Sequence, residues 1–215
     1  MSRIWHDQMF LILLILVLVS SNVHGQSTGS IVGWGSQVVV EQEALEDLVA
    51  IAGGVHHSLG LNSEGSIVAW GYNGDGQCNV PVPNENYIAV EEGRYHSLGL
   101  KVDGSIIAWG TDGFYDYGQS YVPEPNSGFV AIAGGDWHSL GLQSNGAIVS
   151  WGRNEYGQCN VPHPNANYIA IAGGGLFSLG LKSDGTIVAW GRNDHGQCNI
   201  PEPNADFVAI AAGYW

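Results

Sequence analysis

The sequence repeats itself four times, and this repetition limits the possible folds more than any other feature. The motif His-Ser-Leu-Gly-Leu, or a variant of it, places its serine at positions 58, 97, 139 and 178. The dipeptide Trp-Gly places its tryptophan at positions 70, 109, 151 and 190, so both series advance by 39, 42 and 39 residues. Self-similarity at such a period indicates a chain built from stacked copies of one small unit.

Each unit contains four short runs whose composition is typical of β-strands, which we label A to D. Between runs B and C stands a polar pair followed by glycine, and glycine takes the positive φ that a hairpin turn requires. The motif Pro-x-Pro-Asn follows run D and removes backbone donors, which ends a strand. In the first unit the runs are Val49–Ala52 (A), Ser58–Leu61 (B), Ser66–Trp70 (C) and Gln77–Val80 (D).

Run C is apolar at successive positions, from Ile67 to Trp70, whereas a strand with one wet face would alternate. Continuous apolarity indicates that both faces of the sheet are covered by neighbouring copies. We therefore expect an all-β fold, a β-propeller with four-stranded blades built from repeats of about 39 residues. The tryptophan ring is expected to fill the space between blades. The glycines expected to leave room for it are Gly60, Gly99, Gly141 and Gly180.

The repeat resembles that of the regulator of chromosome condensation family. The resemblance rests on Gly-x-x-His-Ser-Leu-Gly-Leu-Lys-Ser-Asp-Gly-Thr-Ile-Val-Ala-Trp-Gly-Arg-Asn-x-x-Gly-Gln and covers residues 30 to 215. The short period and the Gly-Gln-x-x-Val-Pro ending are most similar to secreted bacterial members, among which is a β-lactamase inhibitor protein. The resemblance implies a seven-bladed ring that closes by pairing terminal half blades.

The chain divides into complete units 49–87, 88–129, 130–168 and 169–207, with partial units 29–48 and 208–215. The first partial unit supplies a run C and the last a run A. We therefore expect an incomplete ring and the N-terminal part of a longer protein, which can self-associate through its open edge. The alternative is a five-bladed ring with one deficient blade.

Residues 1–25 differ from the rest of the chain. Arg3 precedes an apolar run from Met9 to Val19. This run is shorter than the roughly 20 residues that a membrane-spanning helix needs, and it matches a secretory signal peptide. Cleavage before Gln26 would leave a repeat domain over residues 26–215, located in the periplasm or outside the cell and without stable membrane insertion. An uncleaved membrane anchor is the alternative.

Acidic residues outnumber basic ones by 20 to 6, which gives a formal net charge of −14. Nucleic-acid binding requires lysine and arginine to displace counterions, so we expect no nucleic-acid partner. The charge favours a basic or mixed protein partner.

Cysteine and histidine recur in the repeats but do not form a metal motif. Three of the four units have cysteine in Gly-Gln-Cys-Asn, at Cys78, Cys159 and Cys198, and no Cys-x-x-Cys pair occurs. The histidine before Ser-Leu-Gly-Leu is replaced by Phe177 in the fourth unit, which favours packing over ligation. No nucleophile motif occurs either. We therefore expect no metal, no cofactor, no catalytic residues and no enzymatic activity.

The variable turns carry the functional prediction. Because strands alternate in direction, the A–B and C–D turns emerge on one side of the propeller, which we call the A–B/C–D face. Large aromatic side chains in such turns are typical anchors at protein interfaces. The predicted partner-binding residues are Tyr95, Trp137, Leu176 and Trp215 in the A–B turns, Tyr117, Tyr156 and His195 in the C–D turns, and Phe114 and Tyr115 in an insertion of the second unit.

Alternatives remain for this face. The rings can fold back over their own blades, and the insertion can be drift in a tolerant loop. The resemblance implies protein binding, and inhibition of a secreted or surface enzyme is its sharpest form. Other candidate functions are a carbohydrate-binding or a hydrolytic or lyase propeller. The family's namesake role, nucleotide exchange on a small GTPase together with chromatin binding, is opposed by the leader and the acidity.

Overall fold

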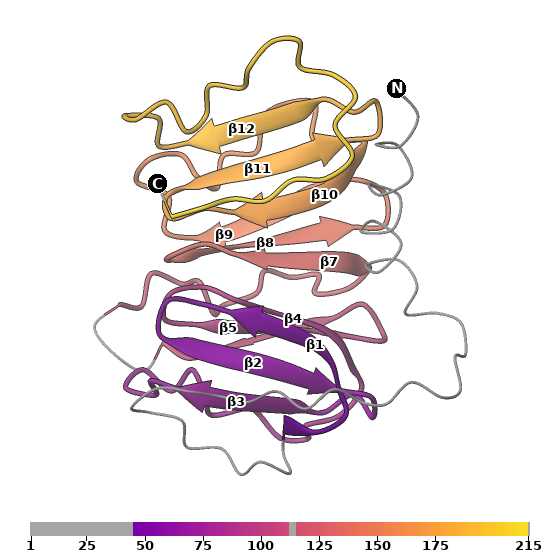
Figure 1. Cartoon of the computed structure of the whole chain (residues 1–215), viewed down its shortest axis with the longest axis vertical. Helices are drawn as coiled ribbons and strands as arrows, with labels where there is room; N and C mark the ends of the chain where they lie inside the picture. The colour runs from indigo at the N-terminus through magenta and orange to yellow at the C-terminus, as the bar shows by residue number, and fades with distance from the viewer. Residues whose placement is uncertain (1–44, 112–114, 215) are drawn as a thin grey trace, which may run out of the picture.

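The computed structural model describes residues 45–111 and 115–214, which form four antiparallel sheets of three strands each (Figure 1). The all-β class is confirmed for these residues. The predicted signal peptide and most of the first partial unit lie outside them. The sheets consist of β1 (Leu48–Gly53), β2 (His57–Asn62) and β3 (Ile67–Gly71); β4 (Tyr87–Glu92), β5 (Ser97–Lys101) and β6 (Ile106–Trp109); β7 (Phe129–Gly134), β8 (His138–Gln143) and β9 (Ile148–Gly152); and β10 (Tyr168–Gly173), β11 (Phe177–Lys182) and β12 (Ile187–Gly191).

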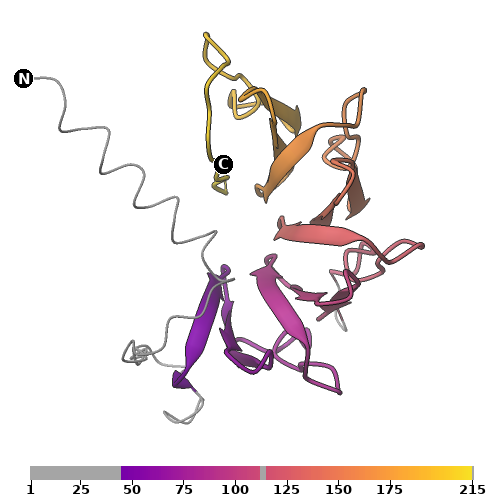
Figure 2. The ribbon, with the colours of Figure 1, turned by 90° about the vertical axis from the view of Figure 1, so that its right-hand side faces the viewer.

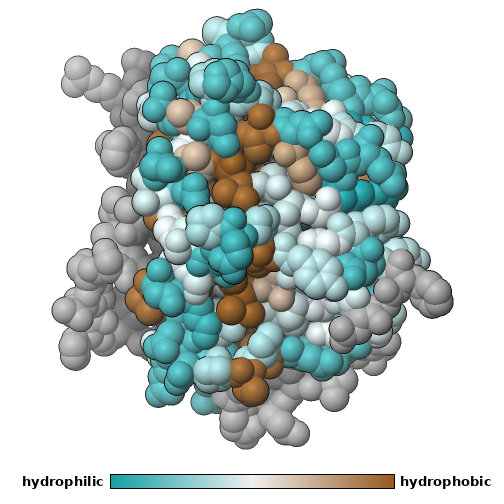
Figure 3. Space-filling model, turned by 180° about the vertical axis from the view of Figure 1, so that it is seen from behind, coloured by the Kyte–Doolittle hydropathy of each residue, from teal (hydrophilic) through white to brown (hydrophobic). Residues whose placement is uncertain are grey.

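The four sheets stand side by side in an arc that is open on one side (Figure 2). The predicted runs A, B and C correspond to the three strands of each sheet, and they follow one another in that order from the inside of the arc outward. From behind, a narrow apolar band crosses the blades between polar side chains (Figure 3). Within the described ranges, no helix is long and apolar enough to cross a membrane.

The prediction of a fourth strand in each blade is wrong. Run D forms a turn and coil in which side chains take the backbone groups that a ladder would use. The Asn73 side-chain oxygen accepts the Cys78 N–H at 2.8 Å, and the Asn79 N–H bonds to the Gly76 carbonyl at 3.0 Å. Side chains of this kind compete with regular secondary structure.

The outer strand nevertheless has a partner at its first residue. The Asn84 side chain, from the Pro-x-Pro-Asn motif, accepts the Ile67 N–H and donates to the Ile67 carbonyl, both at 2.8 Å. The same pair of hydrogen bonds recurs in the other three units. One asparagine side chain therefore replaces one rung of the missing strand.

The hydrophobic core lies between the blades rather than within each of them. One cluster joins Leu59 and Ile67 of the first sheet to Tyr87 and Trp109 of the second sheet. Two further clusters repeat this arrangement across the next two junctions. The Trp-Gly tryptophans Trp109, Trp151 and Trp190 are each buried at such a junction, so the expectation that the ring fills the space between blades agrees with the structure.

The predicted reason for the run B glycines needs correction. A Cβ on Gly99 would lie 2.5 Å from the ring of Tyr87, and one on Gly141 would lie 2.7 Å from the ring of Phe129. The glycines therefore leave room for the large side chain that opens strand A of the same blade. In Gly60 the nearest atoms belong to Leu48, and the Trp70 ring is more distant at 3.3 Å.

Polar groups join neighbouring blades through a repeated set of bonds, which we call the stitch. The Gln77 carbonyl accepts the Ser97 hydroxyl and the Trp109 indole N–H of the next unit, each at 2.9 Å. His57 Nε2 lies 2.8 Å from Ser97 Oγ. Because that hydroxyl already donates to Gln77, the histidine must donate to it through Nε2–H. The recurrent histidines thus have partners in the next blade.

The first and last blades differ from the middle ones at the sides where the described residues supply no neighbouring sheet. Ile51 in β1 is 63% exposed, whereas the equivalent Val90 and Ile132 are 5% and 6% exposed because a preceding blade covers them. The last partial unit has no strand over residues 208–214, although run A was expected there. No run B pairs with it within the described residues.

The stitch predicts the effect of replacing a histidine. His138→Phe copies Phe177 of the fourth unit and should fold, with a loss of about 1 kcal/mol for the bond to Ser178. Burial lowers the pKa of His138 from 6.5 to about 4, so the wild type loses stability as pH falls through this range. The variant should lose ~1–3 kcal/mol less over that range in urea denaturation. Equal acid sensitivity of both proteins would contradict the assignment.

The uncovered strand predicts self-association. Ile51→Glu places a charge on the exposed apolar side of β1 and should lower the association of the full chain. Sedimentation velocity over a concentration series measures it. Val102→Glu, at an exposed B–C turn, is the matched control and should leave association unchanged. A monodisperse monomer in all three proteins would refute the prediction.

Candidate protein-binding face

Recurrent glutamines position the variable residues of the C–D turns. The side-chain oxygen of Gln119 accepts the Tyr117 N–H at 2.7 Å, and that of Gln158 accepts the Tyr156 N–H at 3.0 Å. The backbone of each variable residue is therefore fixed by a residue that repeats. Its side chain is free to differ between units.

Four of the predicted residues form one aromatic cluster across the second and third units. The Tyr95 and Tyr115 rings stack with centroids 4.6 Å apart, and Tyr95 and Trp137 lie 6.4 Å apart. Tyr117 meets Trp137 edge-on at 6.1 Å. These rings contact rings of neighbouring turns, so they do not simply fold back over their own blades.

Arginine guanidinium groups lie over these rings. The Arg94 guanidinium lies 5.4 Å from the Tyr95 ring centroid and 5.7 Å from that of Trp137. Arg153 lies 4.9 Å from Tyr117 and 5.0 Å from Trp137. Cation–π contacts of this kind hold large side chains in place. The cluster is thus partly ordered before any partner arrives, which lowers the entropic cost of binding.

Leu176 and Tyr156 join the face at a cavity of about 210 Å³ beside the cluster. Trp137, Arg153 and Gln197 complete most of its wall. His195 is exposed at the C–D turn of the fourth unit and lines neither of the two cavities described here. Phe114 and Trp215 lie outside the described residues. The partner-binding role of all these residues stays a prediction.

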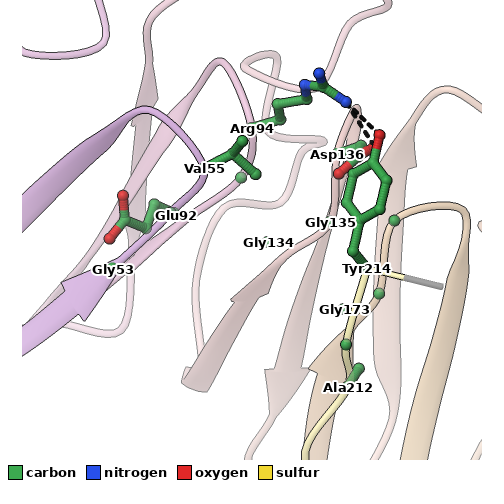
Figure 4. Close-up of a pocket in the computed structure, with 15 residues that line it drawn as sticks. Gly53, Val55, Glu92, Arg94, Gly134, Gly135, Asp136, Gly173, Ala212 and Tyr214 are labelled. Atoms are coloured by element: carbon green, nitrogen blue, oxygen red, sulfur yellow. Dashed lines mark hydrogen bonds and ion pairs between the residues drawn. The ribbon is translucent and has the colours of Figure 1, made fainter. Parts of the chain in front are cut away.

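A second cavity, of about 270 Å³, lies at the hub where the A–B turns converge, and sequence reasoning missed it. Glycines of all four units line it together with Glu92, Arg94, Asp136 and Tyr214. Arg94 reaches the Tyr214 hydroxyl and lies 3.7 Å from an Asp136 oxygen (Figure 4). These three residues share one repeat position, directly before the aromatic position of the A–B turn. The contrast between variable and recurrent positions could have found them.

Glu92 lies apart from the Arg94 guanidinium, with its carboxyl group on the side of Gly53 (Figure 4). Its side chain is 3% exposed, and Oε2 lies 3.4 Å from His57 Nε2. Burial raises the pKa of Glu92 to about 8, and burial lowers the pKa of His57 to about 4. Both groups are therefore neutral between these values, and their contact is not an ion pair at neutral pH.

The three cysteines are free and partly buried. Each donates its thiol hydrogen toward a backbone carbonyl of its own loop, as Cys78 does to Tyr72 at 3.4 Å. Burial raises the pKa of the Cys78 thiol to about 11, which suppresses the reactive thiolate. Within the described ranges, no group of three histidine, cysteine or acidic side chains is arranged to hold a metal ion.

Comparison with known families identifies the repeat. Residues 48–77, 129–158 and 168–197 match the sequence model of the regulator of chromosome condensation (RCC1) repeat. The chain carries repeats of this family, and the resemblance to the repeat is confirmed. The similarity to secreted bacterial members stays a prediction. The second unit, which has the longer C–D connection, is not among the matched segments. Among curated proteins, none matches this sequence significantly.

Solved structures share the fold. Prp20p from Saccharomyces cerevisiae superposes with a TM-score of 0.65 at 19% identity, over 78% of this chain and 54% of that chain. The ectodomain of the Physcomitrella patens receptor kinase CR4 gives 0.65 at 26% identity, over 77% and 47%. Human WBSCR16 gives 0.59 at 19% identity, over 78% and 56%. The chain thus spans about half the length of these relatives.

Removal of the buried Glu92 carboxyl group should raise the free energy of unfolding by an amount that depends on pH. In the folded protein the pKa of Glu92 is raised from 4.5 to about 8. The contribution of Glu92 to stability is therefore complete below pH 4.5 and is lost as the pH rises through 8. Glu92→Gly, which copies Gly53, Gly134 and Gly173, should therefore gain stability relative to wild type by ~1–2 kcal/mol between these pH values. Urea denaturation at both ends measures the gain. A pH-independent difference would contradict it.

Proposed function

We propose that this chain is a secreted protein-interaction module that binds its partner through the A–B/C–D face. The observation that carries the proposal is the cluster of Tyr95, Tyr115, Tyr117 and Trp137, in which rings from separate turns contact one another. Tyr115 and Tyr117 keep 42% and 40% of their surface exposed although they are large rings. Ordered, half-exposed aromatic groups are typical of interface anchors.

The comparisons support the general class of this function. RCC1-repeat propellers serve protein interaction, and the work on Prp20p concerns its binding to Gsp1p and histones. A second solved structure has yeast RCC1 bound to Kap60. Inhibition of a secreted or surface enzyme is the specific form that we favour, because the sequence offers a leader and no catalytic constellation. A partner of basic or mixed charge suits the net charge of −14.

Carbohydrate binding is a second candidate, favoured by the same exposed rings, which can stack on sugars. A glycan array separates it from protein binding. Nucleotide exchange with chromatin binding is a weaker candidate, because the acidic chain would repel DNA. Export of the chain with its own N-terminus, followed by N-terminal sequencing, tests the secreted location. A mature protein that begins at or near Gln26 is the expected result.

Exposed rings should contribute to affinity without supporting the fold. Tyr117→Ala and Tyr156→Ala should each weaken partner binding by about 2 kcal/mol, the range of interface hot spots. Their melting temperatures should change little, since 40% and 42% of these residues are exposed. The partner is first captured on immobilised full chain from the secreted fraction and then titrated by calorimetry. Asp103→Ala and Asp184→Ala, at B–C turns, are the matched controls.

The reverse pattern would sink the proposal: affinity lost with Asp103 or Asp184 and kept with the tyrosines. Trp137 is a less clean probe than the sequence suggested. It is half-buried between Arg94 and Arg153, so Trp137→Ala should lower both affinity and stability.

A further inference from the structure

The second unit breaks the repeat inside its innermost strand. β4 ends in Glu91-Glu92, where the other units have an alanine followed by a glycine. Those pairs are Ala52-Gly53, Ala133-Gly134 and Ala172-Gly173. Because three units fold with the small pair, the fold itself does not require a carboxyl group at either position.

The Glu92 carboxyl group lacks a partner of its own. The residue is 8% exposed, and among the described residues neither side-chain oxygen accepts a well-formed hydrogen bond. The Gly54 N–H lies near enough to lower the pKa of Glu92 somewhat, but it donates to the His57 carbonyl. The neighbouring His57 Nε2–H is directed to Ser97 instead. The carboxyl group packs closely on Gly54, where a Cβ would lie 2.6 Å from Oε2. Burying such a group without a donor is costly, so it needs an explanation.

The arginine of the same cavity does not serve Glu92. Arg94 points to Tyr214 and Asp136 (Figure 4). Asp136 is itself buried, and burial raises its pKa to about 6 in spite of Arg94. The hub therefore holds two desolvated carboxyl groups and one cation, and the cation is placed beside only one of them.

A ligand for the Glu92 carboxyl group has to bring its own hydrogen-bond donors. A bare metal ion would need several ligating groups around it, and the described residues hold no such group of three. The cavity of about 270 Å³ is walled largely by glycine backbone, which leaves room for an elongated chain with a charged end. Lysine and arginine side chains have this form.

We propose that the hub cavity receives a lysine or arginine side chain of the protein partner, and that Glu92, neutral in the free protein, loses its proton to solvent and becomes the counter-ion. The inference rests on the proposed function and deepens it. The hub cavity and the aromatic-lined cavity share Asp136, Gly175 and Tyr214 in their walls, so one loop of a partner can reach both. The net charge of −14 attracts a loop of this kind.

The test uses short peptides and does not depend on identifying the partner. The isotope-labelled full chain is titrated with acetyl-Gly-Lys-Gly-amide, its arginine counterpart and its norleucine counterpart. Backbone amides of the hub glycines report binding by NMR. A basic peptide should bind saturably, in the roughly millimolar range that a fragment of this size permits. The norleucine peptide should bind at least tenfold more weakly.

Two variants copied from the repeat decide the role of Glu92. Glu92→Gly should weaken the basic peptide at least tenfold. Glu91→Ala, the matched control, removes a neighbouring carboxylate that does not line the cavity and should leave affinity within twofold. Equal binding of norleucine, or unchanged binding to Glu92→Gly, would overturn the inference. If only this test fails while Tyr117 and Tyr156 still govern partner capture, the proposed function stands.

Discussion

One backbone carbonyl in each of the first three units ties that unit to the next. The Gln77 carbonyl has two lone pairs, and the next unit fills both with Ser97 and Trp109. Gln119 and Gln158 repeat the arrangement, with donor distances from 2.8 to 3.0 Å. A buried carbonyl that lost these donors would be left unsatisfied, which is more costly than the bonds are favourable. The stitch therefore fixes how each blade is placed on the next.

This fixed placement explains why the turns can vary. The groups that hold the blades together lie in strands B and C and in the Gly-Gln segment, all of which recur. The A–B turn keeps its glycines, and the C–D turn keeps a glutamine and, in three units, an asparagine that bind its backbone. Residues such as Tyr95 and Trp137 can thus change between units without loosening the junctions. The A–B/C–D face is the part of the molecule where sequence can change most freely.

The sequence predicts strands A to C well because their hydrophobic pattern repeats in register. It predicts strand D wrongly because Val80 makes the segment look like a strand, while the backbone groups are taken by side chains. A single asparagine such as Asn84 replaces a rung of a ladder, and no periodicity reveals that. The glycines of run B were correctly read as space, but the neighbour that fills it, Tyr87 at Gly99, depends on register.

The site was predicted where residues of one kind share a repeat position. Four of the predicted aromatic residues contact one another, because equivalent turns lie side by side. Arg94, Asp136 and Tyr214 share a position too, but a cation, an anion and a phenol look like drift until their contacts are known. Glu92 was passed over because it does not recur. In a repeat protein, a polar residue that appears once in a core strand is the stronger signal.

The positions of the cationic side chains determine which charges the A–B/C–D face presents to solvent. Lys101 lies by the B–C turns, over the Tyr87 ring and bonded to the Glu85 carbonyl. Arg153 and Arg192 lie at the A–B/C–D face, where each stacks on a tyrosine and pairs with an acid two residues on. The acids of these pairs, Glu155 and Asp194, keep 60% of their side chains exposed, whereas the arginines keep 18% and 22%. The face thus directs rings and carboxylates outward and keeps its positive charge beneath them. A cationic partner surface meets favourable groups there, and an acidic one meets like charge before it can reach an arginine.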